Sequence, residues 1–231
     1  MARTGEEEEK MDPHRLDEAV RDLKGYVTAN APRLFTKQHR DGKHKRKFSL
    51  KGSYKVGRGS TQPGNIQHIG KKAHFRMHNF KNTAVNLQHV QDQKGINDYQ
   101  KRAYAMAKGV IDLLDPEFAA GETYLVNFSH MNSRHHYVKK HVDADDITYQ
   151  YILSFGEYQG DVKLFVYDKM GNFHQSYNCK DRILKVDGRL PHRVRKTPDF
   201  EGDRFAVIWY KSYDARISVP TPVLANPYFV Y

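Results

Sequence analysis

The stretch YVKKHVDADDITYQYILSF, from Tyr137 to Phe155, places a histidine and an aspartate one residue apart before a run of β-branched and aromatic residues. Such a run is typical of a β-strand. In extended backbone, residues i and i+2 point to the same face of the strand. The side chains of His141 and Asp143 can therefore reach one point in space, and a metal ion at that point is the first hypothesis.

The chain beyond Gly121 has the features of a β-rich region. It contains about eight short strand-like pieces separated by Gly, Asn, Asp and Pro, among them TYLVNFSHM, DVKLFVYDK and RFAVIWYKS. A hairpin turn is expected around Met170–Asn172. Because helical patterns precede these strands, the sequence predicts an α+β protein in which helices support a β-sandwich or barrel on one side.

Two helices are predicted before this region, at Asp12–Ala29 and Asn97–Leu114. Asp12 and Pro13 suit the start of the first helix, and Asn97 or Asp98 can cap the second. The expected buried stripes are Leu16, Val20, Leu23 and Val27 in the first helix, and Tyr99, Ala103, Met106, Val110, Leu113 and Leu114 in the second. We expect a mobile acidic N-terminus over residues 1–11 and a single domain over residues 12–231.

The chain of 231 residues carries a net charge of +11, which favours an anionic partner, most often nucleic acid. We expect DNA more than RNA; the alternative is a basic protein whose charge only keeps it dispersed. Residues 36–64 form a predicted basic loop, and the cluster KHKRK in it resembles a nuclear-import signal. The single cysteine, Cys179, excludes an internal disulfide and a cysteine-based zinc site. An intracellular and nuclear location is expected, with no membrane-spanning segment.

A third metal ligand is needed, because one histidine and one carboxylate are too few to hold a catalytic metal. The best candidate is His192, which follows a Gly-Pro turn at the start of another predicted strand. Arg204 comes next, at the head of RFAVIWY. Two imidazoles and one carboxylate leave three positions open on a non-haem iron, and a buried arginine can grip a carboxylate through two parallel hydrogen bonds.

The order His-x-Asp, then SFGEYQGDVKLFVYD, then His192 and Arg204 resembles the Fe(II)- and 2-oxoglutarate-dependent dioxygenases. The resemblance implies a double-stranded β-helix, or jelly-roll, over about residues 121–213. It implies that His141, Asp143 and His192 are the catalytic iron ligands, and that Arg204 binds the distal carboxylate of 2-oxoglutarate. Dioxygen would be the second cosubstrate and ascorbate a candidate reductant. Within the superfamily, the basic charge favours the TET/JBP-like enzymes, which hydroxylate the methyl group of 5-methylcytosine or thymine.

Other residues near these motifs have two interpretations each. Tyr151 can bind the cosubstrate or be a core aromatic residue, and Arg195 can bind the cosubstrate or a phosphate, or be a solvated charge beside a strand. The segment Gly70–Phe80 mixes basic and aromatic residues, so it can line the mouth of a nucleic-acid site or form an edge strand protected by lysines. His74 and His78 have the spacing of a zinc-binding helix, but no third ligand is near.

Three functions follow from these patterns. The first is an iron- and 2-oxoglutarate-dependent dioxygenase acting on a methylated base in nucleic acid. The second is the same chemistry on a protein side chain or a small molecule. The third is a basic nucleic-acid-binding jelly-roll without a metal.

Overall fold

The computed structural model describes residues 13–35, 73–79, 97–120, 124–132, 140–211 and 220–231. The predicted acidic N-terminus, the basic loop and its KHKRK cluster lie outside the described residues. The boundaries predicted for the single domain stay a prediction. None of the helices in the described part of the chain is both long and apolar enough to cross a membrane.

In the described part of the chain, four helices form one side of the molecule: α1 (Pro13–Ala29), α2 (Ala31–Leu34), α4 (Asp98–Leu114) and α5 (Pro116–Ala120). All four apolar residues predicted for the first helix are buried. Asn97 caps α4 in a reciprocal arrangement with Gln100, in which each side chain accepts a hydrogen bond from the other's backbone N–H.

The buried side of α4 is rotated relative to the prediction. Ala103 and Val110 are buried as expected, whereas Tyr99, Met106, Leu113 and Leu114 are only partly buried against the core. The buried positions are Gln100, Ala103, Tyr104, Ala107, Val110 and Ile111. The rotation is possible because α4 is apolar over a wide arc, so its composition does not select one face.

The strands of the described residues form two antiparallel sheets. The larger sheet has seven strands in the order β1-β2-β9-β3-β7-β10, with β4 paired to β9, and the smaller has the order β6-β5-β8. The strands are β1 (Ala73–Asn79), β2 (Tyr124–Asn132), β3 (Gln150–Phe155), β4 (Tyr158–Gln159), β5 (Val162–Tyr167), β6 (Phe173–Asn178), β7 (Ile183–Val186), β8 (His192–Lys196), β9 (Glu201–Tyr210) and β10 (Tyr228–Phe229). The mixed helical and antiparallel architecture confirms the predicted α+β class.

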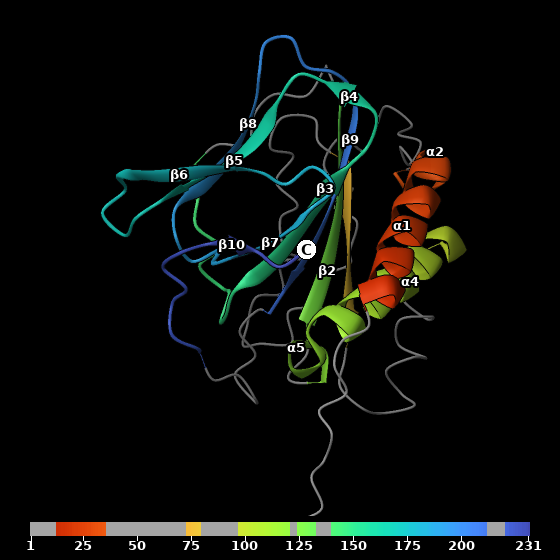
Figure 1. Ribbon diagram of the computed structural model, residues 1–231, viewed down its shortest axis with the longest axis horizontal. Coiled ribbons are helices and arrows are strands. Elements are labelled where there is room, and N and C mark those ends of the chain that lie inside the picture. Colours follow the sequence, from red (N-terminus) through yellow and green to blue (C-terminus); the bar gives the residue numbers. More distant parts are fainter. Residues whose placement is uncertain (1–12, 36–72, 80–96, 121–123, 133–139, 212–219) are drawn as a thin grey trace, which may run out of the picture.

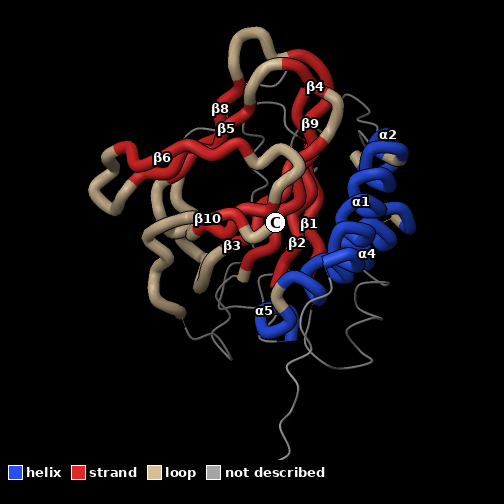
Figure 2. The backbone as a smooth tube through the Cα atoms, in the orientation of Figure 1, coloured by secondary structure: helices blue, strands red, loops and turns tan. Residues whose placement is uncertain are grey.

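The larger sheet lies between the helices and the smaller sheet, as Figures 1 and 2 show. Leu153, Val207 and Trp209 pack against α1 and α4 on one face, where the Trp209 indole N–H donates to the Ala107 carbonyl at 2.9 Å. On the other face, Ile152 and Leu184 pack with residues of the smaller sheet. Strand alternation therefore divides β3 and β9 into a helix-facing side and an inner side that faces the smaller sheet.

Two local predictions can be compared with the backbone. The hairpin around Met170–Asn172 connects β5 to β6, and Gly171 at its tip adopts a φ of 85°, a left-handed conformation that glycine tolerates without steric cost. Residues 73–79 form β1 at the edge of the larger sheet, as the edge-strand interpretation of this segment predicted. His74 and His78 lie on this strand, so the zinc-binding helix is not formed.

Candidate metal centre

His141 and His192 are brought together by backbone pairing. Each residue donates its N–H to the other's carbonyl at 2.9 Å, which forms an isolated antiparallel bridge between a loop and the start of β8. Two residues further on, the Asp143 N–H donates to the Gly188 carbonyl at 2.9 Å. The same two chain segments therefore position all three predicted ligands.

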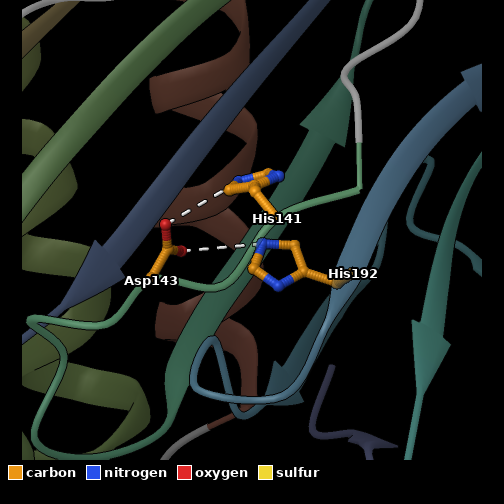
Figure 3. A group of neighbouring side chains, drawn as sticks. All are labelled: His141, Asp143 and His192. Atoms are coloured by element: carbon orange, nitrogen blue, oxygen red, sulfur yellow. Dashed lines mark ion pairs between the residues drawn. The ribbon is translucent and has the colours of Figure 1, made fainter. Parts of the chain in front are cut away.

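The three side chains converge on one point (Figure 3). The Asp143 carboxylate faces both imidazoles from one side, 3.7 Å from His141 Nε2 and 3.6 Å from His192 Nε2. The ligand atoms of the three residues all lie within 4.8 Å of one another. Ligand atoms bound at about 2.1 Å to one metal ion lie roughly 3 to 4 Å apart, so the two histidine–aspartate distances suit a shared ion.

His192 is buried, and its surroundings favour the neutral imidazole. Its Nδ1 lies 2.9 Å from the Leu190 carbonyl oxygen, so this nitrogen carries the proton and donates it, which leaves the Nε2 lone pair facing Asp143. Burial lowers the pKa of His192 and the neighbouring His141 acts in the same direction, while Asp143 opposes them. The neutral imidazole is the metal-binding form.

Gln150 orients the Asp143 carboxylate through a hydrogen bond. Its Nε2 donates to Asp143 Oδ2 at 2.7 Å and to Asp146 Oδ2 at 2.6 Å. A Cβ atom at position 188 would lie 1.9 Å from this Nε2, so only glycine leaves room for the amide. Both Gln150 and Gly188 thus orient the aspartate. No sequence motif marked Gln150 as a functional residue. Only its position on β3, on the side that faces the smaller sheet, indicates its role.

The inner side of the larger sheet is unusually polar next to this centre. Among the described residues, five buried side-chain atoms on this side have no hydrogen-bond partner: Asn127 Oδ1, Ser129 Oγ, Ser154 Oγ, Tyr158 OH and Arg204 Nε. Ser129 and Ser154 both pair with Ala206 of β9, two residues from Arg204, so they belong to one patch. Buried polar groups without partners are costly, which indicates a patch built to receive a polar ligand.

Arg204 gives this patch its charge. The side chain is buried and forms no ion pair with a carboxylate in the described part of the chain. Burial lowers the pKa of the guanidinium, an effect that the nearby Tyr158 hydroxyl and Cys179 thiol oppose. Because arginine keeps its proton in proteins, a buried guanidinium of this kind favours an anionic ligand.

The other two predicted cosubstrate residues do not join this patch. The Tyr151 hydroxyl donates to Asp115 on the helix-facing side of the larger sheet. Arg195 is exposed on the outer face of the smaller sheet, because it alternates with the inward-facing Val194. Neither position supports the predicted contact with a cosubstrate that lies beside the triad.

No protein-family model matches the chain, and no curated protein sequence matches it significantly. Solved structures similar to it include a Pseudomonas putida prolyl-4-hydroxylase, at 12% identity and a TM-score of 0.46, over 88% of this chain and 89% of that one.

Two more are similar over 89% of this chain. One is the Arabidopsis thaliana dioxygenase for auxin oxidation 1 with 2-oxoglutarate (13% identity, TM-score 0.45, 82% of that chain). The other is a full-length Neurospora crassa protein in complex with alpha-KG (12% identity, TM-score 0.40, 73% of that chain). Because these TM-scores lie below 0.5, the function of the site has to be deduced from its own side chains.

Proposed function

We propose that this protein is a non-haem Fe(II)- and 2-oxoglutarate-dependent dioxygenase that hydroxylates a C–H bond of its substrate. The observation that carries the proposal is the convergence of His141, Asp143 and His192 between two antiparallel sheets. Two imidazoles and one carboxylate suit non-haem iron and leave positions open for cosubstrate and dioxygen. The two facing sheets and the helical layer are the architecture expected of a jelly-roll oxygenase core.

The side chains of the site fit both Fe(II) and 2-oxoglutarate. His141, Asp143 and His192 would hold the iron, with Gln150 maintaining the orientation of the carboxylate. Arg204 would bind the distal carboxylate of 2-oxoglutarate, and the unpaired hydroxyls of Ser154 and Tyr158 can donate to the same acid. When bound, the iron and 2-oxoglutarate supply the activation of dioxygen for C–H oxidation. A role for ascorbate as reductant stays a prediction.

The contribution of the chain itself is binding, orientation and exclusion of water. His192 keeps its proton on Nδ1 through the Leu190 carbonyl, so its Nε2 remains available as a ligand. Burial of Arg204 strengthens its attraction for an acid, because charges interact more strongly away from water. In this proposal, His192 would hold the metal to which a small dicarboxylate binds, and Arg204 would bind the far carboxylate of that acid.

For the substrate, we propose a methylated base in nucleic acid, with 5-methylcytosine or thymine in DNA as the first candidates and a nuclear location to match. The net charge of +11 supports this choice through attraction to phosphates. A base in a duplex would have to leave the stack before its methyl group could reach the metal.

The direct test is succinate release with iron, 2-oxoglutarate and a panel of methylated oligonucleotides and peptides. The proposal expects substrate-stimulated succinate with at least one methylated oligonucleotide and hydroxylation of its methyl group. If only peptides stimulate succinate release, the dioxygenase activity is supported and the nucleic-acid substrate is refuted. An absence of turnover with every member of the panel, in protein shown to bind iron, would contradict the assigned chemistry.

A further inference from the structure

We propose that the outer face of the smaller sheet binds single-stranded nucleic acid. This surface, here called the outer platform, consists of Lys140, Phe165, Tyr167, Phe173, Arg193 and Arg195. The biological role of this surface rests on the proposed function, in which nucleic acid is the substrate. Binding of the strand itself would need neither iron nor 2-oxoglutarate.

Strand alternation places Phe165, Arg193 and Arg195 on the outer face. Leu164 and Val166 point inward to the core between the sheets, so Phe165 between them points outward. It pairs in register with Arg193 of β8. The two flanking residues of Arg193 are His192, a member of the metal triad, and Val194, which packs inward. The outer platform and the metal centre therefore share strand β8.

The aromatic part of the outer platform is contiguous, with Phe173 exposed, Phe165 partly exposed and Tyr167 buried. The Phe173 ring centroid lies 5.8 Å from that of Phe165 and 6.0 Å from that of Tyr167. Phe173 is 58% exposed, and Met170 in the adjacent hairpin is 85% exposed. An exposed aromatic group on a sheet offers flat faces on which an unstacked base can pack.

Basic groups surround these rings. The Arg193 guanidinium carbon lies 5.4 Å from the centroids of both Phe165 and Tyr167, and Lys140 Nζ lies 4.8 Å from that of Tyr167. Arg193 is partly exposed and Arg195 is exposed, so basic side chains of the outer platform remain accessible to a phosphate.

The charge of the outer platform is not neutralised internally. None of Lys140, Arg193 and Arg195 forms an ion pair with a carboxylate of the described residues, whereas the neighbouring Lys163 pairs with Asp161 at 3.0 Å. Positive groups alternating with aromatic rings suit a polymer that itself alternates phosphates and bases. Single strands are favoured over duplex because the bases of a duplex are stacked on one another and cannot pack on the rings.

The test is fluorescence anisotropy with the full-length, iron-free protein and a labelled single-stranded DNA of about 20 nucleotides, long enough for one such site. We expect binding that weakens with salt, and a loss of affinity of about tenfold or more for Phe173→Ala through lost stacking. Arg195→Gln should reduce the slope of log affinity against log salt by about one unit. Both positions are exposed, so neither change disturbs the core.

Matched controls lie elsewhere on the molecule. Tyr228→Ala removes another exposed aromatic residue, and Arg15→Gln removes an exposed charge from α1; both should bind like the wild type. Equal losses in platform and control variants, absence of binding at low salt, or equal affinity for a duplex of the same length would overturn the proposal. Binding of the single strand, together with no turnover of any oligonucleotide or peptide in the panel, would instead refute only the oxygenase.

Discussion

The Asp143 carboxylate depends on one amide for its orientation. Gln150 donates to both Asp143 and Asp146, which keeps two neighbouring carboxylates apart and satisfied. Groups that hydrogen-bond a metal ligand commonly change metal affinity by about 10- to 100-fold. Gln150 therefore belongs to the metal centre although it cannot itself be a ligand in this arrangement.

The change Gln150→Met keeps the side-chain length and removes both donors. We expect Fe(II) affinity to fall by about 10- to 100-fold, measured by anaerobic titration. Gln175→Met, at an exposed position of β6, is the matched control and should bind iron like the wild type. Unchanged affinity in Gln150→Met would mean that Asp143 is oriented without the amide.

Arg204 is the residue whose replacement separates cosubstrate binding from metal binding. Arg204→Met should raise the apparent KM for 2-oxoglutarate far more than it weakens Fe(II) binding, because the guanidinium faces the acid and not the metal. The unfolding free energy of the iron-free protein should be unchanged or increase by about 1 kcal/mol, since a buried charge without a carboxylate partner is removed. Denaturant unfolding measures the second effect, and Arg15→Met serves as a surface control. An unchanged KM would show that Arg204 does not bind the cosubstrate.

Sequence patterns predicted that His141, Asp143 and His192 would meet, and the structure brings these side chains together. The same patterns placed Tyr151 wrongly relative to the ligands. Its position assumed an unbroken strand from His141 onward, whereas a turn closed by the Asp146 N–H and the Asp143 carbonyl interrupts it. The alternation restarts at Gln150, so Gln150 points to the inner side and Tyr151 to the helices.

At the scale of elements, the predictions worked best where one face of a segment is apolar. The stripe of α1 and the hairpin between β5 and β6 were predicted closely. The short elements α2, α5, β4 and β10 were not predicted, because two to five residues carry too little periodicity. The apolar arc of α4 is broad, so only its contacts with the larger sheet determine which residues are buried.

Gly109 lies inside α4, where glycine lowers the stability of a helix. A Cβ atom at this position would meet nothing within 4 Å, and glycine inside a helix costs roughly 1 kcal/mol relative to alanine. Gly109→Ala should therefore raise the unfolding free energy by about 0.5 to 1 kcal/mol. Gly188→Ala is the contrasting variant: its Cβ would collide with Gln150, so this change should destabilise the protein. A loss of stability in Gly109→Ala, measured by denaturant unfolding, would contradict the helix packing described.

For the whole molecule, three layers create two separate interiors. The interior between helices and the larger sheet is apolar, with Trp209 and Phe128 fully buried. The interior between the sheets is apolar around Leu184 and Val186 but polar around Arg204 and Ser154. The polar region could not be predicted from the sequence, since it depends on which side of three strands faces the smaller sheet.

The stability of the iron-free protein should depend on pH through His192. Its pKa is lowered in the folded state, so the unfolded chain binds the proton more readily and stability rises with pH. Stability should be fully present above about pH 6.5, the usual histidine value, and should decrease as the pH falls below it. His192→Gln should flatten this dependence, measured by unfolding between pH 5 and 8 in steps of about one unit. A variant with the wild-type slope would place the titrating group elsewhere.

The most direct measurement is anaerobic Fe(II) titration of the purified protein, with the variants His141→Ala, Asp143→Ala and His192→Ala beside His14→Ala as a control on the surface of α1. We expect one iron per chain for the wild type and the control, and loss of binding in each of the variants at His141, Asp143 and His192. Iron binding that survives all three changes in folded protein would contradict the metal centre.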